Sequence, residues 1–294
     1  MSSDVFNLKY VLITPARNEE GYIERTLQSV VQQTVLPLKF VVVSDGSTDR
    51  TDEIVSSYAG KYAWIELLKM PAREARHFGG KVAAFKAGYA HTQGLQYDIL
   101  ASLDADLSFP PDYFEFLLRK FAENPRLGVG GTPFSETGEL YDYRFSSIEH
   151  VSGACQLFRR ACYEAIGGYV PLKGGGIDVV AVQTAKLRGW DTRSFPERLL
   201  VHHRPMSSAN HNNVLTGRFK LGERAYTLGW HPLWQVFRSL YQMSRKPYIL
   251  GGGALFFGFF WAMLKRKEQP LSREVIEFQR REQMKRLRAF FLKA

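Results

Sequence analysis

Short apolar runs alternate with amphipathic stretches along roughly the first two hundred residues. Four apolar runs have the length and the residue content of buried strands, and they lie at 10–14, 40–43, 64–68 and 97–103. Between them, apolar residues recur at helical spacing at 23–31, about 50–58 and 79–88. This β-α-β-α-β-α-β order predicts an α/β fold with a doubly wound, mostly parallel sheet and right-handed crossovers.

The pattern continues in the next hundred or so residues with less regular elements. We expect helices at 112–121, from 160 to about 167, and 179–187, and strands at 127–132, 155–158 and 199–203. Ser, Asn and His dominate 204–213, which is typical of a boundary. The expected organisation is therefore a catalytic domain at 1–208 and a separate C-terminal region at 209–294.

Two of the predicted strands end in aspartate. Asp104-Ala105-Asp106 follows the strand at 97–103, and Asp45-Gly46-Ser47 follows the strand at 40–43. The carboxyl ends of parallel strands share one edge, where open α/β sheets bind nucleotides. Carboxylate oxygens suit a hard divalent cation, which offsets phosphate charge. The pattern therefore indicates a nucleotide site with a metal, although Asp45 as a helix cap and the other two as plain loop residues are alternatives.

The net charge of +10 is concentrated in the last third of the chain. From Val201 onward there are 17 basic and 5 acidic residues, so the predicted catalytic part is close to neutral. The uncharged run at 248–264 lies between basic residues and is short for a membrane span, which needs about 20 apolar residues. The stretch 272–293 has the pattern of a basic amphipathic helix.

This tail predicts a membrane surface as partner. Anionic lipid headgroups account for both the charge and the apolar run, whereas nucleic acid accounts only for the charge, and no nucleic-acid recognition module is present. A buried helical hairpin and a dimer interface are the alternatives for the apolar run. Cys155 and Cys162 fit no metal-ligand spacing and are expected to pack as small apolar residues in a reducing compartment; the sequence shows no secretory signal.

Taken in chain order, these motifs resemble those of the inverting nucleotide-sugar transferases of family 2, which have the GT-A fold. The resemblance covers roughly residues 8–205. It is carried by Thr14–Glu20, Val43–Asp49, Asp104–Asp112, Gly153–Cys155 with Gly167–Tyr169, and Asp178 with Gly189.

The resemblance implies a role for each matching residue. In the donor site, the first loop contacts the nucleoside and corresponds to Pro15, Ala16, Arg17, Asn18 and Glu19. The second loop binds the base and corresponds to Asp45, Gly46 and Ser47. Lys81 corresponds to a residue near the base or phosphates, and Asp104 with Ala105 corresponds to the third loop, nearer the ribose. Asp106 corresponds to the direct ligand of Mg²⁺ or Mn²⁺, and Asp178 to the catalytic base.

The base and the second metal ligand match the family less closely. The family usually has Glu-Asp at the base, whereas this chain has Ile177-Asp178. A plain helix cap is therefore a rival interpretation of Asp178, and Glu136, Glu139 or Glu149 could supply a base instead. The resemblance also implies a metal-binding histidine on the strand after the base helix. Adjacent strand residues face opposite sides, so at most one of His202 and His203 faces the site. We favour His203, which adjoins Arg204 at the strand end, with His202 as the alternate, and a plain solvent histidine is the rival interpretation.

The resemblance implies a metal-dependent inverting glycosyltransferase, either a hexosyl- or an N-acetylhexosaminyl-transferase. The donor is a nucleotide-sugar, with a UDP-sugar favoured because Asp45 suits an imide N–H. We expect the acceptor to be a hydroxyl of a lipid-linked molecule, which the apolar tail favours, or of a glycan, in cell-surface polysaccharide synthesis at the cytoplasmic face of the inner membrane. A degenerate transferase acting as a membrane scaffold is the alternative, and a sugar-1-phosphate nucleotidyltransferase ranks lower, because the first loop lacks the glycine-rich pattern of that class.

Overall fold

The computed structural model describes residues 8–71, 78–136, 139–140, 147–172, 174–204 and 214–293. The chain divides into two compact units. The first comprises Met1–Lys173 with Ile177–Arg204, and the second comprises Gly174–Gly176 with Pro205–Ala294. Each unit is described by itself below.

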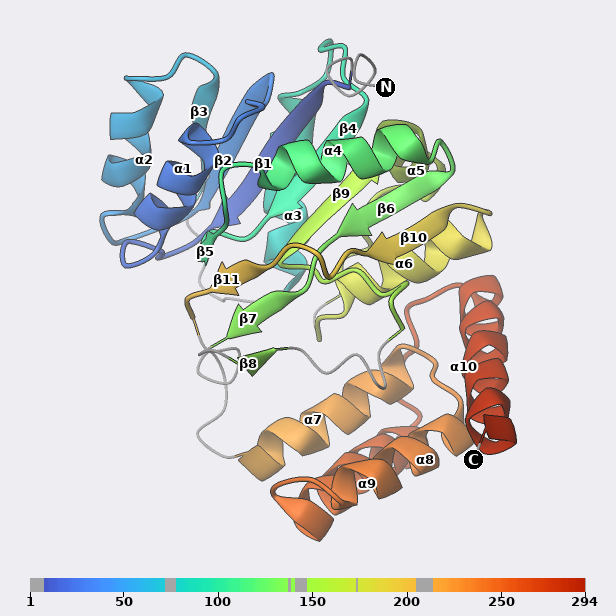
Figure 1. The fold of residues 1–294 in the computed structure, drawn as a ribbon. Helices are drawn as coiled ribbons and strands as arrows, with labels where there is room; N and C mark the ends of the chain where they lie inside the picture. The colour runs from blue at the N-terminus through green and yellow to red at the C-terminus, as the bar shows by residue number, and fades with distance from the viewer. Residues whose placement is uncertain are drawn as a thin grey trace. The chain divides into compact units, whose positions relative to one another are not determined.

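The first unit is built on a seven-stranded sheet with the order β10-β6-β9-β4-β1-β2-β3 (Figure 1). Its strands are β1 (Tyr10–Ala16), β2 (Lys39–Asp45), β3 (Ile65–Met70), β4 (Ile99–Leu103), β6 (Leu127–Gly131), β9 (Cys155–Arg159) and β10 (Asp191–Ser194). Strand β9 runs antiparallel to both of its neighbours, while the remaining pairs are parallel. The expected mostly parallel α/β sheet is confirmed.

Helices cover both faces of this sheet. The helices of this unit are α1 (Ile23–Val31), α2 (Thr51–Ala59), α3 (Phe78–Ala90), α4 (Tyr113–Glu123), α5 (Arg160–Ala165) and α6 (Ile177–Leu187). Buried residues of α1 and α4 pack with Leu12 and Val42 on one face. Helix α3 packs on the other face, where a Cβ at Gly88 would lie 2.7 Å from Ile13 and 2.9 Å from Val43. Alternate residues of one strand thus serve two helical layers, as a doubly wound sheet requires.

A second, small sheet brings the end of the first unit back to the loop after β4. Its strands, in spatial order, are β5 (Leu107–Ser108), β11 (Leu200–His202), β7 (Phe134–Glu136) and β8 (Glu139–Leu140). Strand β11 pairs antiparallel with β5, with His202 opposite Leu107. The strand expected at 199–203 is therefore present, and its register places a histidine beside the aspartates at 104 and 106.

The second unit is helical, with α7 (Val214–Thr227), α8 (Pro232–Met243), α9 (Tyr248–Leu264) and α10 (Arg273–Lys293). Helices α7 and α9 approach closely through glycines: a Cβ at Gly222 would lie 2.2 Å from the Leu255 carbonyl oxygen, and one at Gly258 would lie 2.0 Å from the Phe219 carbonyl oxygen. Within the described residues, we find no helix that combines the length and the apolar content needed to cross a bilayer.

Candidate functional site

The loops that follow β1 and β2 are hydrogen-bonded to each other. The Thr48 amide donates to Asn18 Oδ1 at 2.8 Å, and the Asn18 amide donates to Ser47 Oγ at 3.2 Å. Asn18 has a φ of 55°, a left-handed conformation that asparagine tolerates better than most residues. One polar side chain therefore ties the two loops together at the edge of the sheet.

Asp49 strengthens the same junction. Its carboxylate accepts from the Glu20 and Thr51 amides, each at 3.0 Å, and from the Thr51 hydroxyl at 2.6 Å. Burial acts to raise the pKa of Asp49, but these hydrogen bonds outweigh it and hold the pKa below its ordinary value. Asp49 therefore organises the loop as a carboxylate.

The residues expected to bind the donor lie along this edge. Pro15 and Ala16 end β1, opposite Val43 and Ser44 of β2, and Arg17 follows at the surface, half-buried. Asp45 ends β2 with a side chain that is almost fully buried, and Gly46 follows with a φ of 67°, which favours glycine. These residues thus meet where the loops after β1 and β2 join.

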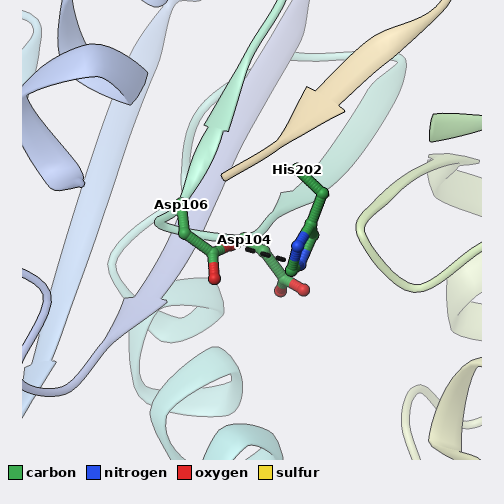
Figure 2. Close-up of side chains that lie close together, drawn as sticks. All are labelled: Asp104, Asp106 and His202. Atoms are coloured by element: carbon green, nitrogen blue, oxygen red, sulfur yellow. Dashed lines mark ion pairs between the residues drawn. The ribbon is translucent and has the colours of Figure 1, made fainter. Parts of the chain in front are cut away.

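Three side chains converge just beyond β4. Asp104, Asp106 and His202 each offer a ligand atom, and these atoms lie within 4.8 Å of one another. Figure 2 shows the three side chains pointing toward one another, with His202 Nε2 3.5 Å from Asp106 Oδ1. The buried Ala105 lies between the two aspartates. The fold therefore brings together two aspartates and a histidine that are almost a hundred residues apart in the sequence.

The two adjacent histidines have different environments. His203 lies against α1 and β5: its Nε2 is 2.8 Å from Ser108 Oγ, and its Nδ1 is 3.2 Å from Arg25 Nη1. Burial, together with the charge of Arg25, lowers the pKa of His203. The geometry therefore places His202, the alternate residue, and not His203 beside the aspartates. The sequence alone does not decide this, because the choice depends on the register of β11 against β5.

The cluster fits a divalent cation. Asp106 Oδ1 and His202 Nδ1 are buried and have no hydrogen-bond partner among the described residues. A buried polar atom without a hydrogen bond costs free energy, and a cation bound to Asp106 Oδ1 would remove that cost. Two carboxylates with one imidazole form a donor set that suits Mn²⁺, and the carboxylates suit Mg²⁺.

A half-buried lysine links this cluster to the predicted base. Lys81 Nζ forms an ion pair with Asp104 and donates to the Gly153 carbonyl at 3.3 Å, and the Gly153 amide donates to Asp178 Oδ2 at 3.2 Å. Burial acts to lower the pKa of Lys81, but the charges of Asp104, Asp178 and Asp106 raise it above its ordinary value. Burial, with the charge of Asp106, also raises the pKa of Asp104 even though Lys81 opposes it. One ammonium thus faces three carboxylates.

The sequence does not predict the link between Lys81 and Asp178 through Gly153. This link uses a backbone amide and a backbone carbonyl, which every residue type except proline has. A Cβ at Gly153 would lie 3.0 Å from Asp178 Cβ, so glycine allows the loop to approach the start of α6. The motif Gly153-Ala154-Cys155 is the only hint of this in the sequence.

Arg204 adds a cation to the same edge. It forms an ion pair with the buried Glu19, its Nε lies 3.5 Å from Asp106 Oδ2, and its guanidinium lies over the Tyr22 ring. A positive group beside a candidate metal site is suited to contacting a phosphate. Glu19 is thus held by Arg204 and by its own amide, which donates to Thr51 Oγ1 at 2.7 Å.

The alternative bases have less suitable surroundings or lie outside the described side chains. Glu149 forms an ion pair with Lys186 Nζ at 2.5 Å on the side of α6. The side chains of Glu136 and Glu139 lie outside the described part of the chain. Both cysteines are buried and reduced, as expected for small apolar residues, and burial raises the pKa of each thiol to about 12.

Comparison with known protein families identifies the chain. Residues 11–171, more than half of its length, match the family model described as "Glycosyl transferase family 2". The chain belongs to glycosyl transferase family 2. The resemblance noted in the sequence is thus confirmed.

Relatives of this family 2 chain carry several different names. It is 34% identical over 201 residues to the "Probable glycosyltransferase YdaM" of Bacillus subtilis, an alignment that covers 64% of this chain and 44% of that protein. It is 34% identical over 114 residues to a "Dolichyl-phosphate beta-glucosyltransferase ALG5A" of Trichomonas vaginalis, covering 36% and 33%. It is 30% identical over 113 residues to a "Chondroitin synthase" of Pasteurella multocida, covering 38% and 11%. The chain therefore spans less than half the length of these relatives.

Solved structures show the same fold. A mannosyltransferase from Pyrobaculum calidifontis, in complex with GDP-Man and Mn²⁺, has a TM-score of 0.60 at 18% identity, and the match covers 94% of this chain and 79% of that one. The TarS protein of S. aureus, in complex with UDP-GlcNAc, has a TM-score of 0.54 at 13% identity, covering 92% and 78%. This family 2 chain therefore has the fold of the GT-A glycosyltransferases.

Proposed function

We propose that the chain is a metal-dependent, inverting glycosyltransferase that moves a sugar from a nucleotide-diphosphate sugar to an acceptor hydroxyl. The observation that carries the proposal is the convergence of Asp104, Asp106 and His202 at the edge of the parallel strands, where the buried Asp106 Oδ1 has no hydrogen-bond partner among the described residues. Ligands of open α/β sheets bind at this edge. Family membership supports the reaction class.

Asp106 and His202 are the residues we assign to a divalent cation, Mg²⁺ or Mn²⁺, with Asp104 beside them. When bound, such a cation offsets the negative charge of the nucleoside diphosphate leaving group. His203, which the sequence favours as ligand, is better placed to hold the edge of β5 through Ser108. Arg204, which is paired with Glu19 and lies beside Asp106, is the cation that we assign to a donor phosphate.

The donor's nucleoside is assigned to the loops after β1 and β2. The loop Pro15–Glu19 is held rigid by Asn18 and by the buried ion pair of Glu19. The buried carboxylate of Asp45 is an acceptor suited to the imide N–H of uracil, which favours a UDP-sugar. A rigid loop lowers the entropy cost of ordering the donor.

Asp178 is assigned as the general base that takes the proton of the acceptor hydroxyl as it attacks the anomeric carbon. It lies in the first turn of α6, where the Gly153 amide orients one carboxylate oxygen. The second oxygen is the one that we assign to the acceptor. Attack from the face opposite the leaving group inverts the anomeric centre, and a positioned base typically contributes about 10²–10⁴-fold in rate.

The acceptor is proposed to be a hydroxyl of a lipid-linked molecule or a glycan, used in cell-surface polysaccharide synthesis on the cytoplasmic side of the inner membrane. The names of two relatives support this range, since one is a dolichyl-phosphate glucosyltransferase and another a chondroitin synthase. Whether the sugar is a hexose or an N-acetylhexosamine is left to a donor screen.

The test is a turnover assay with a panel of UDP- and GDP-sugars, in Mn²⁺, comparing the wild-type chain with Asp178→Asn. The variant should lose about 10²–10⁴-fold in kcat while its affinity for the nucleotide stays within about threefold. Glu149→Gln is the matched control and should keep wild-type turnover. Wild-type turnover in Asp178→Asn would remove Asp178 as the base, and failure of the wild-type chain to bind any nucleotide or metal would support the scaffold alternative.

A further inference from the structure

Helix α9 lacks the polar face of an ordinary surface helix. Its 17 residues, Tyr248–Leu264, include no charged side chain. A helix that is apolar all round is normally buried in a core or in contact with lipid. Within the second unit, only part of its circumference is covered.

One side of α9 packs on its neighbours through small residues. Gly258 and Leu255 lie against α7, and a Cβ at Gly252 would lie 2.4 Å from the Ser239 carbonyl oxygen of α8. Leu255 and Phe259 are buried on this side. The packed side of α9 is therefore fully used by contacts within the second unit.

The opposite side of α9 is open. Five large apolar residues on this side are between 46% and 75% exposed, and they are Ile249, Leu250, Phe257, Trp261 and Leu264. Successive helical residues are about 100° apart, so these five fall within one third of the circumference, an apolar stripe along the whole helix. We call this stripe the α9 outward face.

The charge around the stripe is mostly positive. Between Glu223 and Glu268 the chain has seven basic and no acidic residues. Arg245 and Lys246 precede the helix, and Lys265, Arg266 and Lys267 follow it, of which Lys267 forms an ion pair with Glu223 at 2.6 Å. Lys265 lies over the Trp261 ring at 4.8 Å, an arrangement typical of a membrane interface, where an indole and a cation share the headgroup level.

We propose that the α9 outward face docks the protein on an anionic lipid bilayer, with the helix lying along the interface. Basic groups at both ends match anionic headgroups, and the apolar stripe between them enters the acyl boundary. The helix is about 26 Å long, less than the roughly 30 Å of a hydrocarbon core, so an interfacial position fits it better than a span. This deepens the proposed function by naming the surface that would meet a lipid-linked acceptor.

A second copy of the chain is a poorer occupant of this face. In an antiparallel pair of α9 helices, Arg245 and Lys246 of one copy would meet Lys265–Lys267 of the other. In a parallel pair, each basic end would meet its own counterpart. Both arrangements bring like charges together at the rim of the contact, whereas anionic headgroups neutralise them.

The experiment is flotation of the purified full chain with vesicles of phosphatidylcholine alone and of phosphatidylcholine with phosphatidylglycerol. The wild-type chain should float with the anionic vesicles and be released by salt. The double variant Phe257→Ser, Leu264→Ser should bind about tenfold or more weakly, because two large apolar side chains no longer enter the lipid. A triple variant with Lys246→Gln, Lys265→Gln and Arg266→Gln should no longer bind vesicles with phosphatidylglycerol better than vesicles without it.

Two controls keep the outcome clear. The double variant Leu36→Ser, Leu38→Ser removes two exposed leucines from the first unit and should bind as the wild type does. Phe257→Leu keeps an apolar side chain and should bind within about threefold; circular dichroism reports the folding of every variant.

Absence of wild-type binding to either vesicle would overturn the proposal, as would equal binding by Phe257→Ser, Leu264→Ser. A dimer in light scattering that this variant converts to monomer would assign the face to a second copy instead. Flotation needs no turnover, and nucleotide binding in Mn²⁺ is measured on the same variants. A wild-type chain that binds nucleotide but does not float rejects only the docking surface, and one that floats but binds no nucleotide rejects only the proposed function.

Discussion

Replacing Lys81 by methionine removes the half-buried ammonium whose charge acts on Asp104, Asp106 and Asp178, while keeping a side chain of similar length. The ion pair with Asp104 is lost, and so is the 3.3 Å hydrogen bond to the Gly153 carbonyl. We expect the variant to be less stable and the side chains of Asp104, Asp106 and His202 to be less well ordered.

The size of the effect follows from burial. Removing one partner of a buried ion pair typically costs about 3–5 kcal/mol, because a charge is left unpaired in a medium of low polarity. The side chains of Lys81 and Asp104 are 25% and 27% exposed to solvent. Solvent screens part of the remaining charge, so about 2–3 kcal/mol is the expected loss, or about 5–10 °C in Tm.

The assay is thermal unfolding in EDTA from neutral to acidic pH. Burial holds the pKa of Asp104 above its ordinary value in the folded protein, so its protonation favours the folded state. A raised folded-state pKa gives stability that is present at low pH and is lost as pH rises through that pKa. Without Lys81 the pKa rises further, so the deficit of Lys81→Met should be largest near neutral pH and shrink in acid.

A double-mutant cycle with Asp104→Asn decides the matter. The free energy of unfolding of the double variant should be at least about 1 kcal/mol higher than the sum of the two single losses predicts, because the double variant has no unpaired carboxylate. An unchanged Tm in Lys81→Met, or strictly additive losses, would refute the reasoning. A deficit that grows as pH falls would also refute it.

Two further predictions concern metal binding and helix packing. His202→Ala should weaken Mn²⁺ binding, measured by calorimetry, by about 10–100-fold, while His203→Ala changes it by less than about threefold; equal losses would contradict the assignment of His202. Gly258→Ala should destabilise the second unit in urea unfolding by about 1–3 kcal/mol or more, because its Cβ would lie 2.0 Å from the Phe219 carbonyl oxygen. Gly253→Ala, with nothing within 4 Å of its Cβ, should be neutral or slightly stabilising, and equal effects at the two glycines would contradict the packing.

The hydrophobic pattern predicts the long elements well. The helix expected at 23–31 is α1, and the uncharged run at 248–264 is α9, because polar residues and prolines mark their ends. Strand β10 is not predicted, since Asp191–Ser194 has no large apolar residue and gains its place by pairing with β6. The glycine-containing α7 is also not predicted, because its helical state depends on packing against α9.

The candidate site is predictable where it depends on residue type and not where it depends on register. Asp104 and Asp106 follow a buried strand, so their position at the sheet edge is evident from the sequence. The choice between His202 and His203 needs the pairing of β11 with β5, two strands of only three and two residues. Such strands are too short to give a periodic signal.

The central claim is that the cluster around Asp106 binds a nucleotide together with a divalent cation. The direct test is a thermal-shift comparison of the wild-type chain and Asp106→Ala with UDP, GDP, dTDP and CDP, each with and without Mn²⁺. A ligand at a hundredfold excess over its Kd raises stability by about 2.7 kcal/mol. We predict a shift that is largest with UDP, requires Mn²⁺ and is lost in Asp106→Ala. Absence of any shift, or an equal shift in the variant, would contradict the account.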